Sequence, residues 1–160
     1  MAGVGNVLRS DDAFGVRVAE RLVGRDLGPD VRVIETGIGG IHLVQELMDP
    51  VDVLLVLDAT DRGRPPGTVM VIEPEVADVT EMPLIERYDY LCDMHYANPE
   101  RAFVLARGLG VLPPTFLLIG CQPVDAETPA IGMSVQVTAA VDVAVGEVVR
   151  IITELRDAAV

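Results

Sequence analysis

Two acidic residues and one histidine stand next to the ends of predicted elements, where side chains that do chemistry are commonly found. Asp12 follows a glycine turn and opens a predicted helix, while Asp58 ends a long apolar run. His95 precedes a second predicted helix. Two carboxylates and an imidazole form a ligand set that suits a borderline metal ion such as nickel or zinc. A pair of carboxylates can also divide the work of a general acid and a general base.

Each of these residues also has an ordinary structural interpretation. Asp11 and Asp12 could cap the following helix or interact with its dipole, because acidic residues favour a first helical turn. Asp58 could simply form a turn, and His95 could be a solvated loop residue. What favours a site is that the three residue types converge on one predicted edge of the fold.

The other reactive side chains are interpreted mainly as structural. His42 begins a short predicted helix, and Cys121 is typical of a buried thiol at a strand end. Cys92 lies three residues before His95, which leaves a Cys–His dyad as an alternative, although such pairs normally meet in space rather than in sequence. Asn6 lies in the glycine turn, where it could orient a substrate backbone or hold the turn itself.

Strands that alternate with helices would bring the three positions to one crevice. The sequence predicts helices at 12–23, 41–47, 98–109 and along the C-terminal stretch, and strands at 31–35, 51–57, 68–72 and 115–119. This alternation favours an α/β sandwich with a mostly parallel sheet and helices on both faces. Ligands in such folds bind outside the carboxyl ends of the strands.

Three details of this arrangement are less regular. The short connection between 51–57 and 68–72 predicts that these strands are antiparallel neighbours. Residues 73–94 predict a long functional or variable loop. Only Met1 and Ala2 precede the glycine turn, so either the first strand is very short or the sequence begins late.

Composition narrows the class of protein. The chain has 160 residues, half of them hydrophobic, which suits a single domain over residues 1–160 with a buried core. Its net charge is −13 and all 12 basic residues are Arg, which argues against binding nucleic acid or an anionic membrane surface. Two cysteines cannot form a disulfide framework, and no signal peptide or membrane span is evident. We therefore expect a cytoplasmic protein.

The motifs that carry these residues resemble those of one family. The stretch from Gly3 to Gly15 is similar to G-x-G-N-x-L-x-x-D-[DE]-x-x-G, the opening signature of nickel–iron hydrogenase maturation endopeptidases. The strand that ends in Asp58 resembles their second signature, and His95 before a helix resembles their third. Gly120-Cys-Gln-Pro and the long terminal helix resemble the family's C-terminal part, so the likeness covers nearly the whole chain.

The resemblance implies a three-layer αβα sandwich whose twisted sheet has five strands, one of them antiparallel. It implies an endopeptidase that removes a C-terminal extension from the hydrogenase large-subunit precursor after nickel insertion. It also implies that Asp12, Asp58 and His95 bind metal, sensing nickel already held by the substrate. Other divalent ions could occupy the same site. We expect Asp12 and Asp58 to be the catalytic carboxylates, either directly or through a metal-bound water.

Some observations leave other functions open. Residues 35–40 differ from the D-G-G-T-x-G of relatives, which predicts different substrate contacts there, and residues 73–94 do not align with the family. A non-catalytic nickel-binding maturation chaperone would use the same three ligands, and a related peptidase with another substrate, of the spore germination type, would use the same fold. A dinucleotide-binding turn is disfavoured, because Leu8 replaces the third glycine of that motif.

Overall fold

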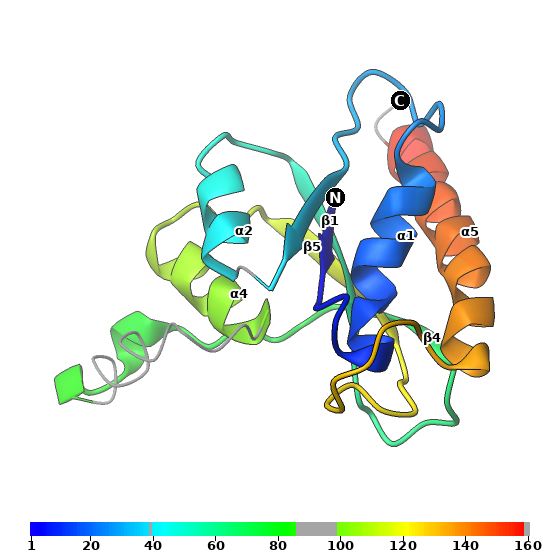
Figure 1. Cartoon of the computed structure of the whole chain (residues 1–160). Helices are drawn as coiled ribbons and strands as arrows, with labels where there is room; N and C mark the ends of the chain where they lie inside the picture. Colours follow the sequence, from blue (N-terminus) through cyan, green and yellow to red (C-terminus); the bar gives the residue numbers. More distant parts are fainter. Residues whose placement is uncertain (39, 86–98, 159–160) are drawn as a thin grey trace.

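The computed structural model describes residues 1–38, 40–85 and 99–158, and its centre is a five-stranded sheet of order β2-β1-β3-β5-β4 (Figure 1). The strands are β1 (Ala2–Val4), β2 (Ile34–Gly37), β3 (Val53–Ala59), β4 (Val69–Ile72) and β5 (Thr115–Cys121). The α-helices are α1 (Phe14–Leu22), α2 (Gly40–Glu46), α4 (Pro99–Gly108) and α5 (Val135–Ala158), and the 3-10 helices are η1 (Ser10–Ala13) and η2 (Val79–Glu81). All pairings are parallel except that of β4 with β5, which confirms the predicted fold class.

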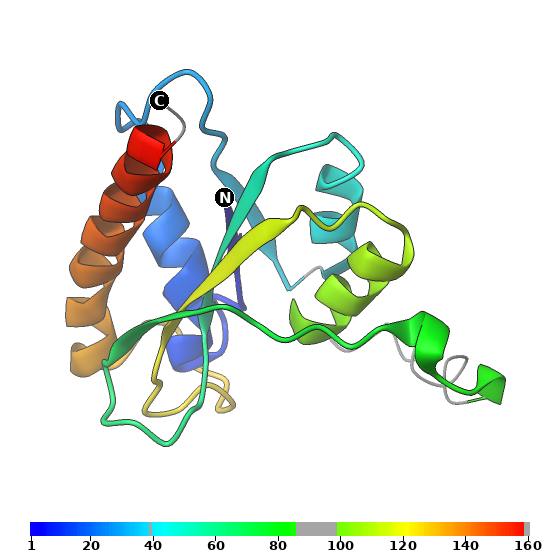
Figure 2. The ribbon, with the colours of Figure 1, turned by 180° about the vertical axis from the view of Figure 1, so that it is seen from behind.

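The helices form two layers. Helices α1 and α5 cover one face of the sheet, and α2 and α4 cover the other (Figures 1 and 2). The apolar side chains of β3 alternate between these layers: Leu55 and Leu57 pack beneath α1 and α5, whereas Leu54 and Val56 pack beneath α2 and α4. A strand buried on both faces has no polar side, which explains the continuous apolar run in its sequence.

Strand β1 has three residues, all buried, and lies between β2 and β3. It includes Gly3 and Val4, which the sequence analysis assigned to the glycine turn, so the turn begins only at Gly5, where φ is +130°. Because β1 pairs with β2 on one side and with β3 on the other, the turn that follows it lies at the carboxyl end of a central strand.

The predicted partner of the fourth strand was wrong. Strand β4 is antiparallel, as expected, but it pairs with β5 and not with β3. The reason is that β5 pairs with β3 along the full length of both strands, from Val53 with Thr115 to Ala59 with Cys121. The connection over residues 60–68 therefore passes the end of β5 before β4 begins. Its length alone could not reveal this intervening strand.

Several element boundaries also differ from the predictions. The strand predicted at 31–35 is β2, which runs from Ile34 to Gly37, and β5 extends past 119 to Cys121. The helix expected at 12–23 is divided into the 3-10 turn η1 and the α-helix α1. Strand β3 extends to Ala59, so Asp58 lies within the strand and not after it. Of the loop predicted at 73–94, only residues 73–85 are described, and they contain η2. None of the described helices is both long and apolar enough to cross a membrane.

Candidate active site

A pocket of about 340 Å³ opens beside the carboxyl end of β3. Asp12 from η1 and Asp58 from β3 both line it, together with Glu100 at the start of α4. The structure therefore brings the two predicted carboxylates into one cavity, at the edge of the sheet where they were expected. His95, the third predicted site residue, lies outside the described residues, as does Cys92.

Glycines in the opening signature let the segment that carries Asp12 approach the strands. Gly15 in α1 packs so closely that an added Cβ would lie 1.9 Å from the Leu57 carbonyl oxygen and 2.3 Å from that of Val4. Gly5 has φ of +130°, and a Cβ there would lie 1.8 Å from the carbonyl oxygen of Asp12. Any larger residue at these two positions would push η1 away from the strand ends. The glycines thus set the position of Asp12.

Asp12 is half-buried, and one of its carboxylate oxygens is hydrogen-bonded to the backbone. Its Oδ2 accepts a hydrogen bond from the backbone N–H of Asn6, at 2.9 Å. Burial raises the pKa of Asp12, while this hydrogen bond and the positive charge of Arg9 oppose the rise. Asn6 also accepts a hydrogen bond from the Leu8 N–H through its side chain, so the structure assigns Asn6 the task of holding the turn.

Asp58 is much less accessible, with 8% of its surface exposed. Burial is the largest cause that raises the pKa of Asp58 well above its ordinary value, and the negative charge of Asp12 adds to the effect. The backbone N–H of Ala59 donates a hydrogen bond that lowers the pKa, and Glu100 raises it slightly further. Burial thus raises the pKa of both carboxyl groups, and it raises that of Asp58 well above its ordinary value, which favours the proton on Asp58 when the two share one.

Asp11 differs from its neighbour, although both were predicted as first-turn acids. It is fully buried and caps no helix; η1 has no side-chain cap. Its Oδ2 accepts bonds from the N–H groups of Val124 and Asp125 at 2.8 and 3.2 Å, and from the Ser134 hydroxyl at 3.0 Å. Its Oδ1 accepts the Ser134 N–H at 2.7 Å. Asp11 therefore fixes the loop before α5 against η1.

Gln122, which the sequence analysis did not single out, organises another wall of the pocket. It follows β5 and is 6% exposed, and its Oε1 accepts the backbone N–H of Arg62 at 2.7 Å and of Arg64 at 3.1 Å. Its Nε2 donates to Asp61 Oδ1 at 2.9 Å. The loop after β3 is thereby fixed to β5. The available signal was its place within the Gly120-Cys-Gln-Pro tail motif.

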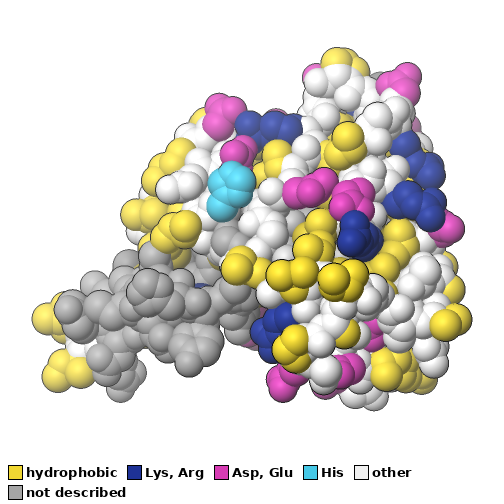
Figure 3. Space-filling view, viewed as in Figure 1, with side chains coloured by type: hydrophobic (Ala, Val, Ile, Leu, Met, Phe, Trp, Pro, Cys, Tyr) yellow, Lys and Arg dark blue, Asp and Glu magenta, His cyan; other side chains and the backbone are white. Residues whose placement is uncertain are grey.

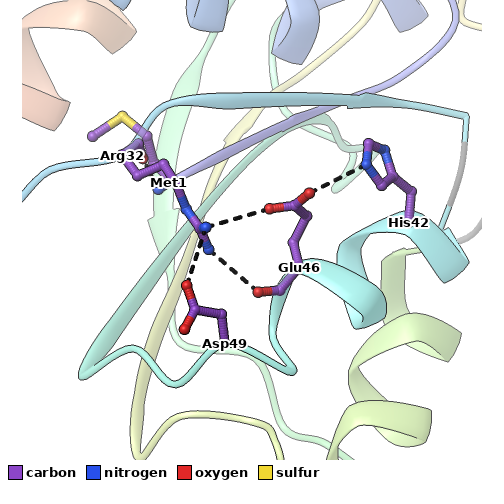
Figure 4. Close-up of polar contacts among 5 residues, drawn as sticks. All are labelled: Met1, Arg32, His42, Glu46 and Asp49. Atoms are coloured by element: carbon purple, nitrogen blue, oxygen red, sulfur yellow. Dashed lines mark hydrogen bonds and ion pairs between the residues drawn. The ribbon is translucent and has the colours of Figure 1, made fainter.

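His42 lies apart from this pocket. In Figure 4 its ring faces Glu46, one turn later in α2, at 3.4 Å between Nε2 and Oε1. Arg32 contacts the same carboxylate at 3.6 Å and Asp49 at 3.4 Å. These contacts agree with the structural interpretation of His42. Cys121 is likewise buried, and burial raises the pKa of its thiol to about 11.

The described residues alone do not complete a metal site. Among them, no three His, Cys, Asp or Glu side chains are arranged to hold a metal ion. Asp12 and Asp58 can supply two oxygen ligands, and a third ligand would have to come from elsewhere, such as His95 or the substrate. On the face seen in Figure 3, Arg and acidic side chains are interspersed among hydrophobic ones, without one broad basic patch in the described part.

The sequence is similar to those of known proteins. A family model, HycI, described as hydrogenase maturation protease, matches residues 16–151, which include Asp58 and begin after Asp12. Hydrogenase expression/formation protein HupD of Rhodobacter capsulatus is 32% identical over 149 residues, covering 92% of this chain and 68% of HupD. HoxM of Cupriavidus necator is 35% identical over 130 residues, covering 78% of this chain and 59% of HoxM. The chain thus spans about three fifths to two thirds of these relatives.

The fold is shared with solved structures as well. The hydrogenase maturating endopeptidase HybD from E. coli superposes with a TM-score of 0.72 at 28% identity, over 96% of this chain and 90% of HybD. The match to the family model covers most of the chain, and the sheet and both helical layers agree with the solved relative. This chain therefore belongs to the hydrogenase maturation protease family.

Proposed function

We propose that this protein is an endopeptidase that removes a C-terminal extension from the large-subunit precursor of a nickel–iron hydrogenase after nickel insertion. The observation that carries the proposal is that Asp12 and Asp58, from two separate signature motifs, line one pocket in different protonation environments. Membership of the hydrogenase maturation protease family supplies the substrate class.

The two carboxylates can carry out peptide hydrolysis without a nucleophilic side chain. Ionised Asp12 takes a proton from water as the water oxygen bonds to the scissile carbonyl carbon. Asp58 gives its proton to the leaving nitrogen when the carbon–nitrogen bond breaks. The roles follow from burial, because burial raises the pKa of Asp58 well above its ordinary value and so favours the proton on the more buried acid. The proton on Asp12 then passes to Asp58, directly or by exchange with solvent that protonates Asp58, which restores the starting state.

Nickel in this proposal belongs to the substrate. Asp12, Asp58 and His95 are proposed to contact nickel that the precursor already holds, so that cleavage follows loading. A carboxylate that binds a metal ion must be ionised, and a cation in the pocket would lower the raised pKa of Asp58. While Asp58 contacts nickel it holds no proton to give, so its acid role applies to a state in which Asp58 is not bound to the metal, and the pH dependence of cleavage distinguishes the two states.

Mass spectrometry of the precursor tests the proposal. The purified large-subunit precursor from the same organism, loaded with nickel or nickel-free, is incubated with the wild-type protein or with Asp12→Asn, Asp58→Asn or His95→Ala. We expect loss of the extension only from loaded precursor, and a fall in rate of at least about 100-fold for either Asp→Asn variant. Asp142→Asn, an exposed acid on α5, is the matched control and should retain the wild-type rate.

Different outcomes separate the parts of the proposal. A loaded precursor that wild-type protein binds but leaves intact would refute the endopeptidase and favour a nickel-binding chaperone. Cleavage of nickel-free precursor at the same rate would refute nickel recognition while keeping the protease. Normal cleavage by His95→Ala would remove His95 from the site.

A further inference from the structure

We propose that Arg62 is a specificity residue of this pocket and that it binds an acidic side chain of the precursor beside the scissile bond. The inference rests on the proposed endopeptidase function and names a feature of its substrate. It is carried by three observations: the hydrogen-bonded loop that presents Arg62, the single positive charge among the described residues of the pocket lining, and the exposed ion pair that a substrate carboxylate could replace.

The loop that carries Arg62 is held in place before any substrate binds. The Gln122 side chain is buried and accepts the Arg62 N–H at 2.7 Å. Its amide also donates to Asp61, whose Oδ1 accepts the Gly63 N–H at 2.9 Å. These bonds join the loop to β5 through one side chain and close a tight turn at residues 61–63. A preorganised backbone spends less binding free energy on ordering, which suits a recognition element.

Arg62 is the lone cation among the described residues that line the pocket. The same lining includes four carboxylates, those of Asp12, Asp58, Asp61 and Glu100. An acidic group on a substrate would be repelled over most of this surface and attracted at Arg62. Such a pattern fixes the register of a bound peptide, because a shift along the pocket moves the acidic group against like charge. The planar guanidinium can also bind a carboxylate through two parallel hydrogen bonds.

The current partner of Arg62 can be displaced. Its guanidinium contacts Glu100 Oε1 at 3.5 Å, and the two side chains are 46% and 63% exposed. An exposed pair at this distance contributes little to stability, so exchange for a substrate carboxylate is not opposed by the fold. Glu100 is the second residue of α4, and both side chains of the pair line the pocket. The ion pair therefore lies in the cavity that a peptide would enter.

A charge-reversal experiment tests the inference by binding rather than by cleavage. A fluorescent peptide that spans the cleavage point of the precursor is titrated with wild-type protein, Arg62→Glu and Arg64→Glu. Arg64 is the matched control, since Gln122 holds its N–H as well but its side chain does not line the pocket. We expect Arg62→Glu to weaken binding roughly 10- to 100-fold, and Arg64→Glu to stay within about twofold of wild type.

Peptide variants provide the second arm. Each acidic residue of the peptide is replaced in turn by Lys, and one replacement should restore binding to Arg62→Glu while weakening it for the wild type. With the full precursor, KM should carry the change and kcat should be nearly unaffected. Thermal unfolding of both Arg variants checks that they fold.

The outcomes distinguish this inference from the proposed function. Equal binding by wild type and Arg62→Glu, restoration by no Lys peptide, or a cleavage segment without any acidic residue would each overturn the role of Arg62. Peptide binding that depends on Arg62, without cleavage of loaded precursor, would keep that role and refute the endopeptidase. Cleavage of loaded precursor by Arg62→Glu at the wild-type rate would keep the endopeptidase and refute the role of Arg62.

Discussion

Asp11 and Asp12 are adjacent acids of one motif, and the structure places them in different surroundings: Asp11 is fully buried among hydrogen-bond donors, whereas Asp12 lines the pocket. Replacing Asp11 by Asn keeps its shape but changes one carboxylate oxygen into an amide that donates. Turned for the best fit, the Asn oxygen would retain the three donors on the Oδ2 side, and its amide would face the N–H of Ser134. We therefore expect Asp11→Asn to lower the stability of the fold itself.

The magnitude follows from counting these contacts. One charge-assisted bond is lost, with a buried N–H left facing another donor, and three bonds to an anion become bonds to a neutral oxygen. At about 1.5–3 kcal/mol for a hydrogen bond to a charged group, the free energy of unfolding should fall by roughly 2–4 kcal/mol. For a chain of this size the Tm should fall by roughly 5–12 °C. Asp12→Asn, which affects one bond to the Asn6 N–H, should change it by less than about 3 °C.

Measuring both Tm and precursor cleavage for the two variants tests whether Asp11 stabilises the fold and Asp12 supports cleavage. Asp11→Asn should unfold earlier while retaining cleavage well below its transition, and Asp12→Asn should keep its Tm while losing cleavage. An unchanged Tm for Asp11→Asn would refute the role of its carboxylate in fixing the loop before α5. A large fall in Tm for Asp12→Asn would show that the signature acids both serve the fold.

Three further predictions concern burial and close packing. Gly15→Ala should destabilise the protein by about 3 kcal/mol or more, because its Cβ would meet two backbone oxygens. Gly146→Ala, on the exposed side of α5, should stabilise the protein by roughly 0.5–1 kcal/mol. Urea unfolding of the two variants compares these changes. Asp58→Asn should raise the free energy of unfolding at neutral pH, because Asn removes the cost of burying a titrating carboxyl group; urea unfolding at neutral and acid pH measures this. The sign follows because a raised native pKa costs stability as pH rises above the ordinary Asp value, so the gain should vanish in acid. Cys121 should resist iodoacetamide at mildly alkaline pH until the protein is unfolded, since its pKa is about 11; rapid labelling in the native state, seen by mass spectrometry, would contradict this.

The sequence allowed the prediction of features that depend on local pattern. The apolar run of β3 identified a strand buried on both faces, and the glycines of the first motif identified a turn at the sheet's edge. These signals are local because burial and positive φ constrain the residue itself. The position of Asp58 at the end of that run followed from the same pattern, apart from one residue of strand length.

The missed features depend on contacts between distant segments. The donors to Asp11 lie 113 to 123 residues away, so nothing beside it in the sequence distinguishes a buried acid from a helix-dipole acid. The pairing of β4 was wrong because it depends on where β5 enters the sheet, and Gln122 was overlooked because its partners belong to a loop some 60 residues earlier. His95 stays a prediction, since it lies outside the described residues.

The position of the pocket follows from the alternation of side chains along β3. Leu57 points toward α1 and α5, so Asp58 points to the opposite face and continues the row of Leu54 and Val56 beneath α2 and α4. Asp12 arrives from η1, which leads into α1 in the other layer. Side chains from the two layers can meet only where the sheet ends, and the close packing at Gly15 brings η1 to that edge. A shift of β3 by one residue would turn Asp58 into the other core, so the register with β5 is as necessary to the site as the acids themselves.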